Sequence, residues 1–459
     1  MTIPENIFKS YDIRGIYPTE INEENVSQIT KAIFAFLTKD YPAGQPFKFG
    51  LGRDMRLSSP ALFQIAKDTL ISLGAQVVDL GLLSTPSFYF AVSNLGLDGG
   101  FIISASHNPK EYNGMKIIRK IDKGVLKIGK NTGIDEIKRL ALEGVQPPAG
   151  QGSVTEESSV LEKEAEKALE IAGHPNIKPF KVVADAGNAM GSLYVEELFK
   201  HIPGELTRMN FNLDGNFPAH QPDPLQPKNL VDLQNKVRET GADIGLAPDG
   251  DGDRMFIVDE NGQIVPPSII TSIIAKELLK THPGATIIAD IRYLINAREN
   301  VDEAGGKLSV SKVGHAFITE QLQNEGAIFA GESSAHYFFA ATGGAEAQMP
   351  VILIILAVMS REGKPLSEIA ESCRRAFESS EINFEVKNGP ELLDLVKQKY
   401  ADGEISTLDG VAVSYPDLRI SLRSSNTEPL IRLNVEAKDK VKMEQTKNEV
   451  VQLIQSAKK

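Results

Sequence analysis

The sequence predicts an α/β fold, in which three similar α/β units with mixed sheets follow one another and a smaller α+β domain ends the chain. Two observations support this prediction. A chain of 459 residues is long enough for three or four domains of ~100–150 residues each. Three stretches also share one pattern, in which a strand, a helix-length segment and two further strands lead to a polar loop.

Apolar runs bounded by turn residues mark the strands of the three units. We expect first strands at 47–54, 180–185 and 285–290, second strands at 75–80, 205–211 and 307–312, and third strands at 101–103, 243–247 and 327–330. The loop after each third strand is rich in small and polar residues. The three loops therefore have equivalent positions, at the carboxyl end of a strand, where open α/β sheets bind their ligands.

The fourth domain is predicted from two segments with alternating hydrophobicity, 418–422 and 431–435, which indicate half-buried strands. A helix is expected at 438–457, with Val441, Val450, Leu453 and Ile454 on its apolar face. Polar linkers at 144–159, 259–262 and 374–382 separate the units. The expected domains are 1–150, 151–258, 259–372 and 373–459.

Charge and composition restrict the class of function. The chain has 49 Lys and Arg against 61 Asp and Glu, a net charge of −12, which disfavours nucleic-acid and membrane partners. The single cysteine, Cys373, excludes an intrachain disulfide and favours a reducing, cytoplasmic location. No signal peptide is expected at the N-terminus. The apolar run 349–359 is too short to span a membrane, and Pro350 suits the first turn of a buried helix.

Ser106 follows the short apolar strand 101–103 and precedes Asn108-Pro109, which turns the chain. An isolated serine in such a place is usually only a turn residue. The other polar loops make a reactive role the better interpretation. His107 is expected to point away from Ser106, because adjacent side chains face apart in an extended chain.

The loop after the third strand of the second unit contains Asp249, Asp251 and Asp253. In an extended chain these alternate residues face the same way, and their charges repel unless a cation is bound. Gly250 and Gly252 let the backbone curl around an ion. Hard oxygen ligands suit Mg²⁺ or Ca²⁺. A calcium EF-hand is the competing interpretation; Arg254 at the sixth position and the strand-like flanks count against it, and Mg²⁺ is preferred.

Two further loops offer ligand-binding groups. The loop 331–336 closes the third unit. The loop 423–429 joins the two strands of the last domain and offers the guanidinium group of Arg423, hydroxyls and backbone N–H groups, which suit a phosphate. A solvated hairpin tip is an equally good interpretation of Arg423 taken alone. A serine, a metal loop and a phosphate loop together indicate phosphoryl transfer. A hydrolytic serine is less well supported, because Gly-x-Ser-x-Gly is absent around Ser106.

The motifs as a set resemble the α-D-phosphohexomutase superfamily, most closely its bacterial phosphomannomutases and phosphomannomutase/phosphoglucomutases. The resemblance extends over essentially the whole chain. It rests on 11–15 (YDIRG), 52–56 (GRDMR), 104–109 (SASHNP), 112–116 (YNGMK), 214–218 (DGNFP), 222–224 (PDP), 249–254 (DGDGDR), 331–334 (GESS) and 423–429 (RSSNTEP).

The resemblance implies four domains around a central active-site cleft, with Ser106 as a phosphoserine. One Mg²⁺ ion would be held by Asp249, Asp251, Asp253 and Ser106. Hexose phosphates would be the substrates, and a hexose 1,6-bisphosphate the intermediate and activator. The resemblance implies catalytic roles for Ser106, Lys116, Arg14, Arg254 and His107, and substrate contacts from Glu332, Ser334, His336, His315, Lys312, Arg423, Ser425, Asn426, Thr427 and Tyr11.

Some points depart from the family pattern or stay open. Ser333 replaces a common Met and Ala335 a common Gly, so the backbone of this loop is expected to differ slightly. Lys116 is the first choice of general base, with His315 and His336 as alternatives. Asn426-Thr427 favours mannose and glucose over glucosamine substrates. A phosphoglucomutase, a phosphoglucosamine mutase and an inactive phosphosugar-binding protein remain alternatives, and a monomer or weak homodimer is expected.

Overall fold

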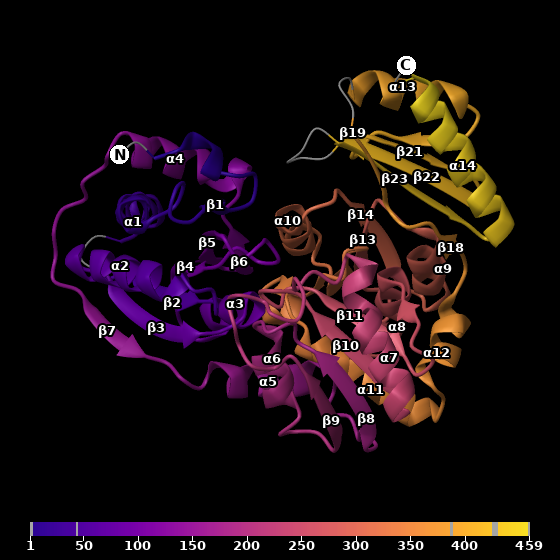
Figure 1. Cartoon of the computed structure of the whole chain (residues 1–459), viewed down its shortest axis with the longest axis horizontal. Helices are drawn as coiled ribbons and strands as arrows, with labels where there is room; N and C mark the ends of the chain where they lie inside the picture. Colours follow the sequence, from indigo (N-terminus) through magenta and orange to yellow (C-terminus); the bar gives the residue numbers. More distant parts are fainter. Residues whose placement is uncertain (1–2, 43–44, 386–388, 425–429, 458–459) are drawn as a thin grey trace. The chain divides into compact units, whose positions relative to one another are not determined.

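The computed structural model describes residues 3–42, 45–385, 389–424 and 430–457 (Figure 1). These residues form two compact units. The first comprises Met1–Val265 and His336–Ser367, and the second comprises Pro266–Ala335 and Glu368–Lys459. The domain boundaries predicted after residues 150, 258 and 372 stay predictions. Within the described ranges, no helix combines the length and hydropathy that a bilayer-spanning segment needs.

The first sheet of unit 1 is covered by helices on both faces. Its strands are β1 (Ile13–Ile16), β2 (Lys48–Arg53), β3 (Gln76–Leu82), β4 (Gly99–Ile103), β5 (Tyr112–Ile121), β6 (Gly124–Lys127) and β7 (Ser153–Glu156), in the order β1-β5-β4-β2-β3-β7 with β6 beside β5. One face packs on α1 (Glu23–Thr38), α2 (Ser59–Ser72) and α4 (Ile134–Leu142), and the other on α3 (Thr85–Asn94). On β4, Phe101 and Ile103 enter the first core, and Ile102 the second.

The second sheet of unit 1 has the order β12-β11-β10-β8-β9. Its strands are β8 (Phe180–Asp185), β9 (Gly204–Met209), β10 (Ile244–Pro248), β11 (Met255–Asp259) and β12 (Ile264–Val265), and its helices are α5 (Val160–Ile171), α6 (Gly191–Leu198) and α7 (Val231–Thr240). The unit also contains the hairpin of β16 (Tyr337–Phe339) and β17 (Ala345–Glu346) and the buried α11 (Met349–Glu362), which has Pro350 in its first turn as predicted. The short helices η1 (Glu5–Ile7), η2 (Lys130–Thr132), η3 (Pro227–Leu230) and η4 (Ala340–Thr342) lie in connections.

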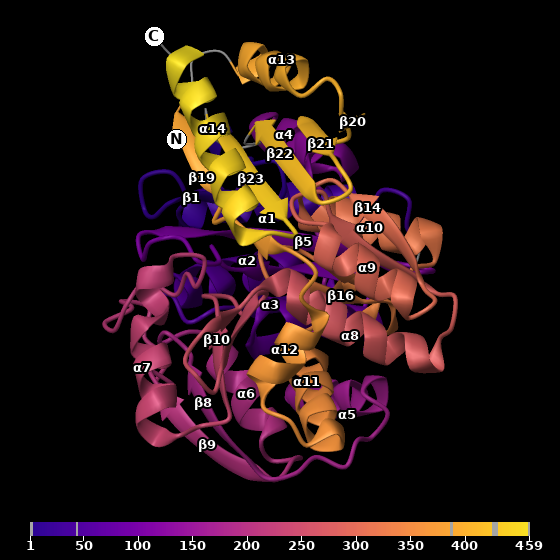
Figure 2. The same cartoon turned by 90° about the vertical axis from the view of Figure 1, so that its right-hand side faces the viewer.

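Unit 2 contains a parallel sheet and an antiparallel one. The parallel strands β14 (Lys307–Ser311), β13 (Thr286–Asp290) and β15 (Phe329–Gly331) are accompanied by α8 (Pro267–Thr281), α9 (Ile295–Glu303) and α10 (His315–Glu325). The antiparallel sheet has the order β18-β23-β22-β21-β20, with β19 beside β23. It comprises β18 (Phe377–Glu378), β19 (Ile382–Glu385), β20 (Glu404–Ser406), β21 (Val411–Ser414), β22 (Leu418–Ser424) and β23 (Leu430–Ala437), with α13 (Gly389–Lys399) and α14 (Lys440–Ala457). Helix α12 (Leu366–Cys373) contains the boundary at Ser367. In Figure 2, α14 runs along β22 and β23.

The predicted threefold repeat is confirmed by the sheet topology. In each case the third strand of the unit lies parallel to the first, and the first parallel to the second, which gives β4-β2-β3, β10-β8-β9 and β15-β13-β14. The polar loops therefore begin at the carboxyl ends of β4, β10 and β15. Figure 1 shows β2, β3 and β4 side by side in the first sheet.

Three local predictions are wrong. The linker 144–159 contains β7, which extends the first sheet by pairing with β3. Strands β22 and β23 are not half-buried, because the polar residues Arg419, Ser421 and Glu436 are buried as well as the apolar ones. Some of their polar groups are paired inside the unit: the Glu436 carboxylate accepts from the first N–H groups of α9, and Arg419 Nη1 donates to Arg292 O. Ser421 Oγ has no hydrogen-bond partner among the described residues. Val441 is exposed, and Met443, in the same first turn of α14, packs into the core instead.

Candidate active site

Ser106 lies in a tight turn immediately after β4. Its φ angle is 52°, a left-handed conformation that L-residues adopt at a cost of about 1–2 kcal/mol. The turn is closed by a hydrogen bond from Asn108 N to Ala105 O, and Ser106 N donates to Ser104 Oγ. Ser106 is only 3% exposed. The nucleophile candidate is therefore held in a strained and buried turn, a pattern that is common at functional sites.

Arg56 binds the backbone of the serine turn, a role that the sequence analysis missed. Its fully buried guanidinium group donates to four backbone oxygens, those of Ser106 (2.8 Å), Asn108 (2.6 Å), Pro109 (2.7 Å) and Tyr112 (3.0 Å). Asp54 Oδ2 lies 3.3 Å from Arg56 Nε and balances the charge. The motif 52–56 contained the signal, but only the structure shows that Arg56 acts on the backbone of the turn.

The three aspartates of the second loop converge beside Ser106. Carboxylate oxygens of Asp249, Asp251 and Asp253 all lie within 4.8 Å of one another, and all three residues are buried. The Ser106 hydroxyl donates to Asp251 Oδ1 at 2.7 Å, and Ser106 Oγ also lies 3.5 Å from Asp249 Oδ2. The predicted convergence is confirmed, but its expected cause is wrong, because the loop is a turn closed by Gly252 N to Asp249 O and not an extended chain.

The two glycines of this loop permit its close approach to the serine turn. A Cβ atom on Gly250 would lie 2.5 Å from Ser106 O, so no other residue fits without displacing the turn. Gly252 has a φ angle of 78°, and its Cβ would lie 2.8 Å from the Tyr194 ring. The sequence DGDGD thus brings carboxylates and backbone to Ser106 at the same time.

Lys116 on β5 provides positive charge at the loop. Its ammonium group donates to Asp251 Oδ2 and to Asp253 Oδ2, the latter at 2.7 Å. Burial alone would lower the pKa of Lys116, but Asp251 and Asp253 outweigh it and raise that pKa well above its usual range. Burial and the charges of Asp253 and Asp251 raise the pKa of Asp249 well above its usual value. Burial disfavours the charge of Asp253 as well, but Lys116 and His336 outweigh it and hold the pKa of Asp253 well below its usual value. Asp249 is therefore the carboxylate of the loop whose charge the surrounding side chains balance least.

A divalent cation fits this donor set. Three buried carboxylates and a serine hydroxyl supply hard oxygen ligands, which suit Mg²⁺ or Ca²⁺. The flanking elements β10 and β11 are strands, which is unlike the helices of an EF-hand. The structure therefore supports a candidate metal site of the kind that the sequence predicted.

The N-terminus of α3 supports Asp251, a contact that the sequence analysis also missed. Thr85 Oγ1 donates to Asp251 Oδ2 at 2.6 Å, and Thr85 N donates to Asp251 O at 2.9 Å. Ser84, the N-cap of α3, accepts from Ser87 N. The first residue of α3, next to the N-cap, thus fixes the rotamer and the backbone of the middle aspartate.

His107 points toward Ser106, and the prediction that it would point away is wrong. His107 Nδ1 lies 3.2 Å from Ser106 Oγ, because the two residues occupy the middle of a turn and not an extended strand. Burial lowers the pKa of His107 well below its usual value, and the charges of Arg254 and Arg14 add to this effect. Arg14, on β1, donates to Asp12 and to the side chain of Asn108, so it contacts the serine turn at its far end.

Arg254 and His336 adjoin the metal loop. Arg254 N donates to Asp249 Oδ1 at 3.2 Å, and its side chain lies 3.3 Å from His336 Nε2. The same histidine nitrogen lies 3.2 Å from Asp253 Oδ1. The structure thus places His336 beside Arg254 and Asp253 in unit 1; the sequence analysis counted it among the substrate contacts and also as an alternative general base.

A second group of predicted residues gathers in unit 2. Arg292 joins them: its guanidinium group contacts Asp290 (2.9 and 3.1 Å), Ser334 Oγ (3.2 Å) and Glu332 Oε1 (3.5 Å). Gly314 N donates to Glu332 Oε1 at 3.1 Å, which brings the predicted segment 312–315 to the same place. The sequence analysis missed Arg292, which lies two residues after the end of its predicted strand.

The expected slight difference between the backbone of the loop 331–336 and that of the family stays a prediction, and Ala335 is the residue on which it rests. This residue has a φ angle of 64°, a left-handed conformation that glycine adopts more readily.

The remaining predicted substrate contacts lie on several different elements. Lys312 is exposed with its ammonium group 5.8 Å from the Phe317 ring centre, and His315 begins α10. Tyr11 precedes β1, and Arg423 lies near the end of β22. Ser425, Asn426 and Thr427 lie outside the described residues.

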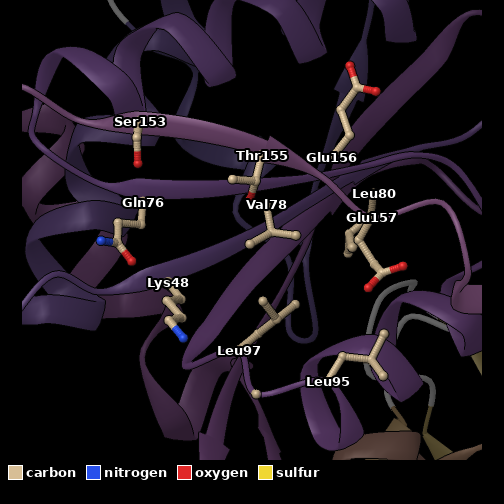
Figure 3. Close-up of a pocket in the computed structure, with 11 residues that line it drawn as sticks. Lys48, Gln76, Val78, Leu80, Leu95, Leu97, Ser153, Thr155, Glu156 and Glu157 are labelled. Atoms are coloured by element: carbon tan, nitrogen blue, oxygen red, sulfur yellow. The ribbon is translucent and has the colours of Figure 1, made fainter.

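A cavity of about 410 Å³ in unit 1 is a separate feature (Figure 3). It is lined by Lys48, Gln76, Val78, Leu97 and Thr155 among others, and so lies largely beside the amino-terminal ends of β2 and β3. Ser106 follows the carboxyl end of β4, which is parallel to β2. The cavity therefore lies toward the amino-terminal ends of the strands, whereas the serine turn lies at their carboxyl ends, and the cavity is not part of that site.

Four domain models of one protein family match the chain, and their matches cover most of it. They are phosphoglucomutase/phosphomannomutase alpha/beta/alpha domain I at residues 5–142, domain II at 164–262, domain III at 266–377, and the C-terminal domain at 381–453. The chain belongs to the phosphoglucomutase/phosphomannomutase family. It is thus an isomerase of the phosphohexomutase class.

Relatives with named activities agree with this family. The chain is 36% identical to "Phosphohexose mutases" of Xanthomonas campestris pv. campestris over 98% of this chain and 99% of that protein. It is 37% identical to a phosphomannomutase of Vibrio cholerae over 95% of each chain. Among solved structures, a phosphoglucomutase/phosphomannomutase family protein of Burkholderia thailandensis has a TM-score of 0.88 at 32% identity, covering 99% of this chain and 98% of that one.

The fold is shared more widely. An N-acetylphosphoglucosamine mutase of Aspergillus fumigatus, solved in complex with GlcNAc-6P and magnesium, has a TM-score of 0.65 at 12% identity. The match covers 98% of this chain and 96% of that one. At this identity the likeness extends to the fold alone.

Proposed function

We propose that this enzyme interconverts mannose 6-phosphate and mannose 1-phosphate, and glucose 6-phosphate and glucose 1-phosphate, through a phosphoserine at Ser106 and a hexose 1,6-bisphosphate. The observation that carries the proposal is the position of the Ser106 hydroxyl, buried and 2.7 Å from Asp251 in a loop of three carboxylates. The names of the relatives, phosphomannomutase and phosphohexose mutases, support the choice of substrates.

In the proposed first step, a hydroxyl of the hexose phosphate attacks the phosphorus of phosphoserine. The Oγ–P bond of Ser106 breaks, a new O–P bond forms on the sugar, and the hydroxyl proton passes to a base. The second step is the reverse at the other end of the bisphosphate, so one phosphoryl group leaves the sugar and returns to Ser106. Positioning and charge neutralisation supply most of the catalysis in such transfers.

Lys116 is our proposed acid and base for these proton transfers. In the structure, Asp251 and Asp253 raise the pKa of Lys116, so the group stands in its acid form. This is the form that protonates the sugar oxygen when the second phosphoryl group leaves. In the opposite direction the neutral amine accepts the hydroxyl proton, as microscopic reversibility requires.

The other residues of unit 1 orient and neutralise the phosphoryl group. Arg56 and Gly250 keep Ser106 in its turn against the metal loop. Arg14, Arg254 and His107 surround the serine turn and offer donors to phosphoryl oxygens. Asp249, Asp251 and Asp253 would hold one Mg²⁺ ion, which would offset the roughly −2 charge of a phosphoserine.

Sugar and distal phosphate are assigned to the residues of unit 2. Glu332 and Ser334 would bond the O3 and O4 hydroxyls, which mannose and glucose share, and Arg423 would hold the non-reacting phosphate with Ser425, Asn426 and Thr427. Arg292 fixes both Glu332 and Ser334, which supports their use as a rigid pair. Position C2 is then weakly discriminated, so both sugars are accepted.

Two measurements test the proposal. Intact mass and peptide mapping of the purified enzyme should place phosphate on Ser106, and Ser106→Ala should abolish turnover. Coupled assays should give kcat/KM values for the 1-phosphates of mannose and glucose within roughly 10- to 200-fold of each other. N-acetylglucosamine 1-phosphate should be the poorer substrate. Phosphate found only elsewhere, with full activity in Ser106→Ala, would overturn the mechanism.

A further inference from the structure

Gln221 lies in the connection between β9 and η3 and contacts the serine turn. Its side-chain Nε2 donates to His107 O at 2.8 Å. Arg56 binds the carbonyl oxygens of the two neighbouring residues, Ser106 and Asn108. Three successive carbonyl oxygens of the turn are therefore held by two side chains that come from distant parts of the sequence.

These hydrogen bonds fix the backbone on both sides of His107. Each carbonyl oxygen belongs to a rigid, planar peptide group. Arg56 holds the peptide group before His107, through Ser106 O, and Gln221 holds the one after it, through His107 O. When both planes are fixed, the φ and ψ angles of His107 are fixed as well, and with them the direction of its Cα–Cβ bond. The position of the His107 ring therefore depends on Gln221 as well as on Arg56.

The ring of His107 presents a hydrogen-bond donor to Ser106 Oγ. A serine hydroxyl has one proton, and Ser106 donates it to Asp251 Oδ1 at 2.7 Å. His107 Nδ1 lies 3.2 Å from the same Oγ and 3.9 Å from Asp249 Oδ2, and both of these oxygens act as acceptors. The network thus assigns the ring proton to Nδ1, which donates to Ser106 Oγ. Such a donor stabilises the negative charge that develops on Oγ when the Oγ–P bond breaks.

Gln221 is itself held in place by polar contacts. Asn229 Nδ2 donates to Gln221 O at 3.0 Å. His220 connects the same oxygen to the end of β8, because its Nδ1 lies 3.0 Å from Gln221 O and its Nε2 lies 3.1 Å from Asp185 Oδ2. The side-chain amide of Gln221 therefore binds the serine turn from a fixed backbone.

We propose that Gln221 is a positioning residue for phosphoryl transfer, which keeps His107 Nδ1 on Ser106 Oγ by holding the backbone oxygen of His107. This inference rests on the proposed function for the reaction at Ser106. Gln221 acts through His107, because its side-chain amide binds His107 O and not Ser106 Oγ. Its effect should appear in kcat, since the ring donates to the oxygen that leaves phosphorus, and not in the binding of the sugar phosphate.

Gln221→Met keeps the approximate length of the side chain and removes its donor. We expect kcat to fall by about 3- to 10-fold, which corresponds to ~0.7–1.4 kcal/mol, the contribution of one hydrogen bond. The KM for mannose 1-phosphate should stay within about twofold of the wild type. His107→Ala should lower kcat by at least about 10-fold. The double variant should be no more than about twofold slower than His107→Ala alone, because two residues that act through one group are not additive.

Gln234→Met is a matched control. Gln234 on α7 is half-buried like Gln221, and its Nε2 also donates to a backbone oxygen, that of Gly262, at 2.7 Å. Both variants lose the same kind of hydrogen bond, so their thermal unfolding temperatures should fall by similar amounts. Only Gln221→Met should lose kcat, which separates positioning of the turn from a general loss of stability.

Each outcome decides the inference. A loss of kcat in Gln221→Met that disappears in the His107→Ala background, with wild-type kcat in Gln234→Met, would support it. If His107→Ala is slow while Gln221→Met behaves like Gln234→Met, the inference is wrong and the proposed function stands. An equal loss from Gln221→Met with and without His107, or an unchanged kcat in His107→Ala, would also overturn the inference. Full activity of Ser106→Ala would instead show that the proposed function itself fails.

Discussion

Glu164 is a buried carboxyl group whose ionisation should make the stability of the protein depend on pH. It lies on α5 with 3% exposure, and its Oε2 has no hydrogen-bond partner among the described residues. Burial raises its pKa from the usual 4.5 to about 7, against a smaller opposite effect of a hydrogen bond from Ser87. Glu164→Gln keeps the shape and the polar contact to Ser87 but cannot ionise.

The size and the sign of the effect follow from the two pKa values. Because the folded-state pKa is above the unfolded one, the neutral form favours folding, and this contribution is complete below pH 4.5 and lost as the pH rises through 7. A difference of about 2.5 pKa units corresponds to ~3.4 kcal/mol in total. Between pH 5.5 and 8.5 the wild type should therefore lose about 2 kcal/mol of unfolding free energy relative to Glu164→Gln.

Urea unfolding followed by circular dichroism at pH 5.5 and 8.5 measures this difference. All other titrating groups cancel when wild type and variant are compared at the same pH, so only the change of their difference matters. Glu166→Gln, on the exposed side of the same helix, should show no such change. A difference between wild type and Glu164→Gln that is the same at both pH values would refute the reasoning and show that Glu164 is solvated or paired.

Three further substitutions test the site itself. Asp251→Asn should lower kcat by at least ~10²-fold and weaken Mg²⁺ binding, since it removes a charge that contacts Ser106 and Lys116; unchanged activity and unchanged EDTA sensitivity would contradict the metal assignment. Arg56→Lys should lower the unfolding free energy by about 3–5 kcal/mol and reduce phosphoserine formation, because an ammonium group cannot reach four carbonyls; a stable, fully phosphorylated variant would contradict this. Arg423→Lys should cost roughly 1.5–3 kcal/mol in binding, seen in KM; an unchanged KM in Arg423→Ala would leave the loop as a hairpin tip.

Features that depend on local sequence could be predicted well. The strands of the three repeats were found within a few residues, because a buried parallel strand needs an apolar run and a polar loop at its end. The convergence of Asp249, Asp251 and Asp253 was predicted correctly, although a turn and not the expected extended chain produces it. Features of this kind depend on residues that are close together in the sequence, so the local pattern predicts them.

Features that depend on contacts between distant residues could not be predicted. Nothing near Arg56 in the sequence indicates that it binds carbonyls more than fifty positions away. The alternation on β22 and β23 correctly predicts strands, but it cannot tell whether the polar face meets solvent or another layer of protein. His107 was misplaced for a similar reason, because the left-handed turn at Ser106 is imposed by its surroundings and not by its neighbours in sequence.

The energetic balance at Ser106 explains why this strained turn persists. The left-handed backbone costs about 1–2 kcal/mol. Each hydrogen bond from the charged Arg56 contributes about 1.5–3 kcal/mol. In two of these bonds the acceptor is a backbone oxygen of the turn itself, that of Ser106 or Asn108. The arginine therefore outweighs the strain, and it does so by binding backbone oxygens, which leaves the serine hydroxyl directed at Asp251. The sequence of the turn can stay small and flexible because its conformation is set by a side chain from another strand's loop.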